Sequence, residues 1–146
     1  MEIIKPNKLR SRPVNKEDLP RVMRDSVEMT RLCGKPLGIR PGAYAIAHCQ
    51  VTDDDPLRFF VLKSGEIYIN PEIISRSGKP VRRPEGCMSF ANLRDVSVKR
   101  HEHIEVVFID GIYMRHDGGT FHGLIARIFQ HEIDHFDGKN IYNISN

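Results

Sequence analysis

The sequence contains no long apolar run, and this absence narrows the kinds of protein that it can encode. Nowhere in the 146 residues do 18 apolar residues follow one another, and the amino terminus lacks the apolar stretch of a signal peptide. We therefore expect a soluble protein of the cytoplasm that has no membrane partner.

Cysteine is scarce, and the charges are nearly balanced. Three cysteines at irregular spacing indicate thiols rather than a disulfide framework. A formal net charge of +3 is only mildly basic, so we expect no specific nucleic-acid partner. The local exception is the run from Arg76 to Arg83, which holds four basic residues and no acidic one. We interpret it as a solvated loop, with a surface for a negatively charged partner as the alternative.

The chain also lacks internal repeats, low-complexity tracts and any linker between regions of different composition. Its length suffices for one domain with a real core, and 40% hydrophobic with 28% charged residues is typical of a globular protein. We therefore predict one domain over residues 1–146.

Local patterns predict an amphipathic helix near the amino terminus and strands after it. Residues 17–32 have helical periodicity, with Asn15 as a cap, Pro20 in the first turn and Gly34 beyond the end. Residues 59–62 and 67–69 read as a hairpin that ends at Asn70-Pro71. Residues 106–109 and 112–115 read as a second hairpin around an Asp110-Gly111 turn.

A second helix-like segment follows the second hairpin and carries His131-Glu132-Ile133-Asp134-His135, an H-E-x-x-H motif. Histidines four residues apart leave the same face of a helix and can bind one metal ion, while Glu132 lies about 100° away and can take a proton from a bound water. The competing interpretation is a surface helix with two solvated histidines.

The flanking residues favour a buried helix. Thr120 is the predicted N-cap, Gly138 stands where the helix would stop, and Leu124 and Ile128 share the stripe of the two histidines. We predict an α+β fold in which antiparallel or mixed β-sheets pack around this central C-terminal helix, together with the one N-terminal amphipathic helix.

Two histidines leave a catalytic metal one protein ligand short, and Cys87 is the best candidate for the third. It follows Gly86, which permits close backbone approach, and a thiolate is a strong ligand for Fe(II), Zn(II) or Co(II). An inert buried thiol is the alternative, and we assign that role to Cys33 and Cys49.

At this point the chain resembles the peptide deformylases, which remove the formyl group from the initiator methionine of nascent proteins. The family's E-G-C-L-S appears as Glu85 to Ser89 with Met88 for the leucine, and its Q-H-E-x-D-H is complete from Gln130 to His135. Its G-Φ-G-Φ-A-A-x-Q, with Φ an apolar residue, aligns with residues 43–50.

The resemblance implies a mechanism for releasing formate from formyl-methionyl nascent peptides. Cys87, His131 and His135 would hold one divalent ion, with Fe(II) expected in cells and Zn(II), Ni(II) or Co(II) as alternatives. Glu132 would act as general base and then general acid on a metal-bound water. The Gln50 amide and the Met88 backbone N–H would stabilise the negative charge on the formyl oxygen.

The resemblance also implies a set of substrate-binding positions, namely Tyr44, Ala45, Gly86, Arg94, Leu124 and Ile128. For Leu124 and Ile128, packing in the core is an equal alternative. The first motif departs from the family because Ala43 and Ala45 replace glycines and His48 replaces an alanine. We hypothesise altered side-chain preference or slower turnover, with His48 either a core histidine or a residue that tunes Gln50 or the metal.

Only eleven residues follow His135, whereas many bacterial relatives continue into a long helix that helps them dock on the ribosome. The chain resembles the short forms encoded by some phages, for which the location would be the host cytoplasm. We expect a monomer that works near the ribosome without that anchor, with the run from Arg76 to Arg83 as a substitute contact.

Two other functions remain open on the sequence. A general zincin-like peptidase would share the helix motif, although Cys87 and Gln50 argue against it. A catalytically weak or inactive deformylase-like protein that binds metal or peptides would explain the altered first motif, although Gln50, Glu132 and the three proposed ligands oppose it.

Overall fold

The computed structural model describes residues 1–6, 8 and 10–144, so Asn7, Leu9 and the last two residues lie outside the description. Its five strands form one antiparallel sheet in the order β1-β2-β3-β4-β5, which confirms the predicted α+β class. The elements in chain order are η1 (Lys16–Asp18), α1 (Leu19–Cys33), β1 (Ala45–Ala47), η2 (His48–Gln50), β2 (Phe59–Leu62), β3 (Ile67–Glu85), η3 (Met88–Phe90), β4 (Val96–Asp110), β5 (Arg115–His122) and α2 (Gly123–Phe136).

The N-terminal helix forms where the sequence predicts it. The Asn15 side chain accepts a hydrogen bond from the Glu17 backbone N–H and caps the short helix η1, which leads directly into α1. Pro20 stands in the first turn of α1, and Gly34 is its C-cap. Val22, Met29 and other buried residues on one face pack against the sheet.

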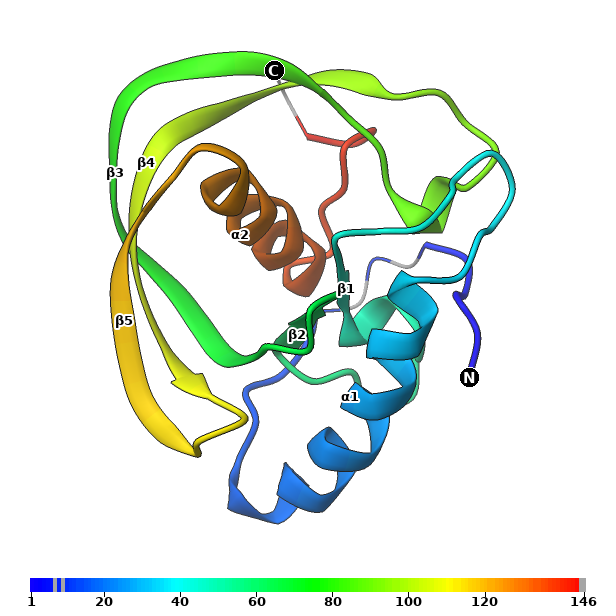
Figure 1. The fold of residues 1–146 in the computed structure, drawn as a ribbon, viewed down its shortest axis with the longest axis vertical. Helices are drawn as coiled ribbons and strands as arrows, with labels where there is room; N and C mark the ends of the chain where they lie inside the picture. Colours follow the sequence, from blue (N-terminus) through cyan, green and yellow to red (C-terminus); the bar gives the residue numbers. More distant parts are fainter. Residues whose placement is uncertain (7, 9, 145–146) are drawn as a thin grey trace.

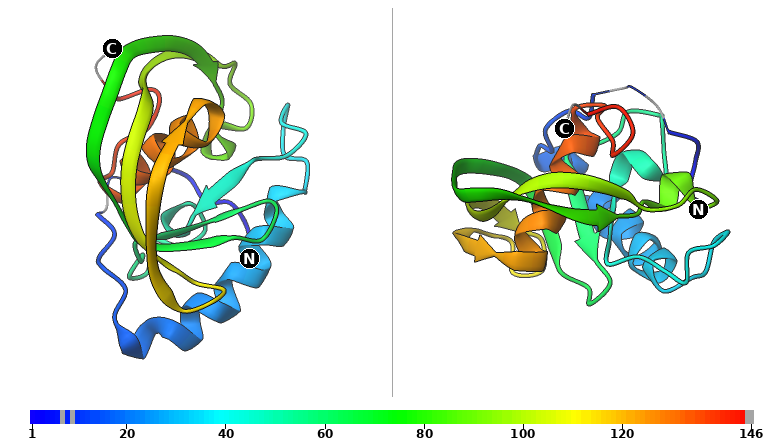
Figure 2. Two further views of the ribbon diagram at one scale, coloured as in Figure 1. Left: turned by 60° about the vertical axis from the view of Figure 1, so that its left-hand side comes forward. Right: turned by 90° about the horizontal axis from the view of Figure 1, so that it is seen from above.

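Strands β1 and β2 lie between the two helices, with a hydrophobic core on each side. Phe59 and Val61 point into the core shared with α1, whereas Phe60 points into the core shared with α2, as the two-residue period of a strand requires. Strands β3, β4 and β5 curve around α2, which lies inside the bend (Figures 1 and 2). The helix that carries both candidate histidines is therefore held centrally, as predicted.

Strand β3 is longer than the sequence predicts. The strand continues through Asn70-Pro71 to Glu85 because it pairs with β4 over almost its whole length, with a register shift at this point. Asn70 has a φ of +49°, and its side chain bonds both the N–H and the carbonyl of Val14. The prediction that the strand ends here is wrong, as is the loop predicted from Arg76 to Arg83, which is exposed strand.

Two further boundaries differ from the prediction. The second hairpin turns over four residues, 111–114, instead of the two predicted, because Asp110 pairs with Arg115 and its side chain accepts hydrogen bonds from the N–H groups that follow. Thr120 is not the N-cap of α2, since it lies in β5 opposite Glu105. His122 takes the cap position, and Gly138 with a φ of +73° follows the end of the helix.

Neither α1 nor α2 has the length and apolar character that a bilayer crossing needs, and the rest of the described chain adds no such helix.

Candidate metal centre and cleft

The structure brings three ligand atoms from two separate segments together. Helix α2 places His131 Nε2 and His135 Nε2 3.2 Å apart, and the Cys87 sulfur, between β3 and η3, lies 3.3 Å from His135 Nε2. All three ligand atoms fall within 4.8 Å of one another. Ligands about 2.0 to 2.3 Å from a tetrahedral ion are separated by roughly 3.3 to 3.8 Å, so the group fits one ion.

The stripe that carries the histidines faces a cleft rather than the core, which corrects the expectation of burial. Leu124 is 55% exposed, and His131 is only partly buried, whereas His135 is buried at the inner end. The core side of α2 is formed instead by Ala126, Phe129 and neighbouring residues. The two imidazoles therefore lie at the boundary between the hydrophobic core and a space open to substrate.

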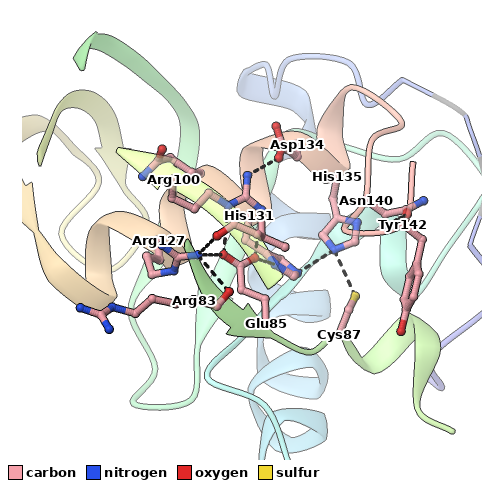
Figure 3. Close-up of polar contacts among 12 residues, drawn as sticks. Arg83, Glu85, Cys87, Arg100, Arg127, His131, Asp134, His135, Asn140 and Tyr142 are labelled. Carbon is pink, nitrogen blue, oxygen red and sulfur yellow. Dashed lines mark hydrogen bonds and ion pairs between the residues drawn. The ribbon is translucent and has the colours of Figure 1, made fainter. Parts of the chain in front are cut away.

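Glu85 fixes the orientation of His131 (Figure 3). The Nδ1 atom of His131 lies 2.9 Å from Glu85 Oε1, so it donates to the carboxylate and leaves Nε2 free to bind an ion. Arg100 and Arg127 also donate to Glu85, and Arg100 reaches Asp134 on α2 as well. Burial raises the pKa of Glu85, but the hydrogen bonds from His131 and Arg100 hold it near 2.

The charges around Cys87, His131 and His135 favour the binding of a cation. Burial raises the pKa of the Cys87 thiol, but the imidazoles of His135 and His131 hold it well below its usual value. Burial lowers the pKa of His131, but the hydrogen bonds that its ring donates to Cys87 and Glu85 raise it to about 10. The group therefore offers one thiolate sulfur and two imidazole nitrogens, and this donor set suits Fe(II), Zn(II) or Co(II).

Glu132 stands beside the ligand group as an uncommitted carboxylate. It is 4% exposed and lines the cleft, and its Oε2 atom has no hydrogen-bond partner among the described residues. Burial raises the pKa of this carboxyl. A buried carboxylate without a partner is costly, so its retention in the cleft is consistent with a role in proton transfer.

Gln50, the last residue of η2, reaches the ligand group with its side-chain amide. Its Oε1 accepts the Ala47 backbone N–H, which leaves the amide nitrogen pointing to Ser89 Oγ at 3.1 Å and to the Cys87 sulfur at 3.4 Å. Met88 begins η3, where a helix leaves its backbone N–H unused. The Gln50 amide nitrogen and the Met88 backbone N–H therefore both lie next to Cys87.

The cleft has a volume of about 410 Å³ and includes most of the predicted substrate positions. Its lining contains Tyr44, Ala45, Gly86, Leu124 and Ile128, and Leu124 contacts the cleft rather than the core. Ile128 does both, since it also packs against the core.

Arg94 does not line the cleft, whereas Arg40, Arg83 and Arg127 do. Sequence reasoning assigned no role to Arg40 or to Glu85. For Glu85 the signals were its place as the first residue of the E-G-C-L-S motif and its acidic side chain two positions before a candidate ligand cysteine. Arg40 gave none, because its partner Asp95 is 55 residues away in the chain.

Comparison with known proteins agrees with this geometry. A sequence model of the polypeptide deformylase family matches residues 15–146. Peptide deformylase 2 of Nostoc sp. is 44% identical over 70 residues, or 48% of this chain and 38% of that protein. The peptide deformylase of Dictyoglomus thermophilum is 33% identical over 130 residues, or 86% of this chain and 75% of the relative.

Among solved structures, the PDF of Vibrio parahaemolyticus bacteriophage VP16T, in complex with actinonin, superposes with a TM-score of 0.79 at 27% identity. That match covers 97% of this chain and all of the phage protein. The chain spans about half the length of most of the curated relatives that it matches. Because the family match extends over most of the sequence and includes both ligand segments, the chain belongs to the polypeptide deformylase family.

Proposed function

We propose that the protein hydrolyses the N-terminal formyl group of formyl-methionyl peptides and releases formate. The observation that carries this proposal is the group Cys87, His131 and His135 at one cleft, beside Glu132, whose buried Oε2 atom has no hydrogen-bond partner among the described residues. Membership of the polypeptide deformylase family supports the choice of a formyl amide as the bond that is cleaved.

Cys87, His131 and His135 would hold one divalent ion, which we expect to be Fe(II) in cells, with Zn(II), Ni(II) or Co(II) able to replace it. When bound, the ion would act as a Lewis acid toward the formyl oxygen and would make a water molecule in the cleft more acidic. Glu85 would preserve ligand geometry by holding the Nδ1–H of His131.

Glu132 carries the proton through the reaction. Its carboxylate accepts a proton from the water whose oxygen attacks the formyl carbon. It then delivers that proton to the methionine nitrogen as the carbon–nitrogen bond breaks, so that formate and a free amine leave. The raised pKa of Glu132 suits this exchange, because a carboxyl that titrates closer to neutral pH both accepts and donates readily.

Gln50 and Met88 would stabilise the negative charge on the formyl oxygen with N–H groups. The Ala47–Gln50 hydrogen bond holds the amide in position before substrate arrives, so little reorganisation is needed during the reaction. Losing one such donor typically lowers turnover about 10²- to 10³-fold.

The peptide would lie extended between β1 and Gly86. Strand β1 is an edge strand with only β2 as its neighbour in the sheet, so its other edge is available for backbone pairing. Tyr44, Leu124 and Ile128 would contact the methionine side chain. Ala45 is buried and lines the cleft, so its methyl group narrows this channel relative to the family's glycine and would slow or restrict binding.

We place this reaction in the cytoplasm, on nascent chains near the ribosome. A monomer suffices for it, since every group in the proposed mechanism comes from one chain.

The decisive experiment measures formate release from formyl-Met-Ala-Ser by protein loaded anaerobically with Fe(II) or Ni(II). Glu132→Gln is the matched variant, because it keeps the shape of the side chain and removes only its ability to carry a proton. We expect kcat to fall by about 10² to 10⁴. Metal content, measured on both proteins, should remain at one ion per chain.

Three results would oppose the proposal in different ways. Undiminished turnover by Glu132→Gln would exclude the proton-transfer mechanism. One bound ion without turnover would instead indicate an inactive metal- or peptide-binding protein. Cleavage of the unformylated peptide Met-Ala-Ser would indicate a peptidase.

A further inference from the structure

Two loops meet across one side of the cleft. The loop from residue 35 to residue 44, before β1, touches the loop from residue 86 to residue 95, between β3 and β4, where the Ile39 N–H donates to the Ala91 carbonyl at 2.9 Å. Gly38 has a φ of +56°, and a Cβ there would come within 2.6 Å of the same carbonyl oxygen. Figure 1 shows these loops, in cyan and yellow-green, reaching each other at the right of the molecule.

Arg40, in the first of these loops, adds an ion pair with Asp95 in the second. Its guanidinium donates to the Asp95 carboxylate and to the Leu93 carbonyl, while its buried Nε has no partner in the described part of the chain. The guanidinium lies directly on Gly86, where an added Cβ would collide with Nη1. Arg40 and Asp95 line the same cleft as the ligand Cys87.

This position overlaps the path of the substrate. If the function proposed above is correct, the peptide backbone runs along Gly86, the surface that Arg40 covers. A peptide and the closed Arg40–Asp95 pair cannot occupy that surface together. The pair must therefore open or shift when substrate binds.

Opening affects the two partners unequally. The Arg40 side chain is 14% exposed and the Asp95 side chain is 47% exposed. Asp95 can therefore turn into water at small cost, whereas Arg40 without a counter-ion would be a charge left largely buried. A carboxylate on the substrate would take the place of Asp95. Arg83 also lines the cleft and adds positive charge there.

We infer that Arg40 is a specificity-determining residue, which selects formyl-methionyl peptides with an acidic residue after the methionine. The inference rests on the proposed function, because it assigns the substrate class of the same cleft. Asp95 acts as the internal competitor of the substrate carboxylate. A peptide with glutamine at this position breaks the Arg40–Asp95 ion pair but offers no carboxylate in place of that of Asp95. A peptide with lysine there places a second positive charge next to Arg40.

The test compares kcat/KM for three tetrapeptides, formyl-Met-Glu-Glu-Ser, formyl-Met-Gln-Gln-Ser and formyl-Met-Lys-Lys-Ser. We expect the glutamate peptide to exceed the glutamine peptide by roughly two- to fivefold, the range for one partly exposed ion pair, and the lysine peptide to be the poorest. Arg40→Gln should bring the glutamate-to-glutamine ratio close to one. Asp95→Asn should raise that ratio, because it removes the competitor and keeps Arg40.

Equal turnover of the three peptides, or a preference that survives Arg40→Gln, would overturn the inference. Calorimetric binding of the same peptides to metal-loaded Glu132→Gln protein separates it from the proposed function. Charge-selective binding without turnover in the wild-type protein would support the role of Arg40 and contradict deformylation. Turnover without charge selection would support deformylation and contradict the role of Arg40. Asp95→Asn serves as a second test in case Arg40→Gln fails to fold. The two substitutions are expected to shift the glutamate-to-glutamine ratio of kcat/KM in opposite directions.

Discussion

His48, which replaces an alanine of the family motif, is a core histidine with two hydrogen bonds. It is fully buried and stacks on Phe59 with the ring centroids 4.6 Å apart. Its Nδ1 accepts the Leu57 backbone N–H, so the ring proton resides on Nε2, which donates to Asp25 on α1 at 3.0 Å. Burial lowers the pKa of the ring, which keeps it neutral. Of the two roles expected for His48, the structure supports the first.

Replacing His48 should separate its packing from its hydrogen bonds. His48→Ala leaves a void and an unpaired Leu57 N–H, and we expect the free energy of unfolding to fall by about 3 to 5 kcal/mol. His48→Phe keeps most of the ring volume and loses both hydrogen bonds, so we expect a loss of about 2 kcal/mol. Urea denaturation measures both. Equal stability of the alanine variant and the wild type would show that the ring contributes nothing.

The grouping of the candidate metal ligands could be predicted from the sequence, but the residues that contact them could not. Histidines at positions i and i+4 face the same way on any helix, so spacing alone predicted the juxtaposition of His131 and His135. Glu85 and Arg127 are 42 residues apart, and no local pattern links an arginine on one element to a carboxylate on another. The cleft-lining role of Arg40 was missed for the same reason.

The N-terminal segment is tied to the start of α1 by charge. Arg12 donates two hydrogen bonds to Asp18 and two to Asp55, and Asp18 also accepts the Asn15 backbone N–H. The hydrogen bonds from Arg12, followed by the one from Asn15, lower the pKa of Asp18 to about 2.

Asp18 should therefore contribute to stability in a pH-dependent way. Its pKa is lower in the folded chain than the value of 3.8 expected when unfolded, so its contribution is complete above about pH 4 and is lost as the pH falls toward 2. We expect Asp18→Asn to be less stable than the wild type at pH 7, with the difference vanishing near pH 2. Denaturant midpoints at pH 7, 4, 3 and 2 give the measurement.

Glu17→Gln is the matched control for this change, because it removes one charge from the neighbouring exposed position of η1. It should leave the pH dependence as in the wild type. A stability gap for Asp18→Asn that is constant with pH would contradict the assigned role of ionisation.

Helix bounds were easier to predict than strand bounds, for a physical reason. Asn15 and Gly34 act within a few residues of the helix that they delimit, so α1 was predicted almost to its ends. Strand β3 passes Asn70-Pro71, a strong local turn signal, because its length is set by pairing with β4, a partner far along the chain. The start of α2 was missed similarly, since β5 extends through Thr120.

The whole chain should unfold as one unit, because one strand contributes to both cores. Phe59 belongs to the core beside α1, and Phe60 belongs to the core beside α2, although the two residues are adjacent. Neither core can separate from the other without breaking β2. The predicted single domain over residues 1–146 therefore has a direct test.

We expect Phe59→Leu and Phe60→Leu each to lower the free energy of unfolding by about 1 to 2 kcal/mol and to shift the same single transition. Circular dichroism and tyrosine fluorescence should give coincident curves for both variants. A variant that melts one helix early, with two resolved transitions in calorimetry, would show that the two cores are separate units.

The three buried cysteines have a practical consequence for handling the protein. Burial raises the pKa of Cys33 and of Cys49 to about 12, so both thiols resist alkylation in the folded chain, whereas Cys87 is held as a thiolate at the cleft. Iodoacetamide should therefore add a single carbamidomethyl group, and only to molecules whose cleft holds no ion to shield the sulfur. Intact mass spectrometry after a brief exposure would then count the metal-free fraction of any preparation. The same chemistry makes air oxidation of one sulfur the expected route by which stored protein loses its capacity for metal.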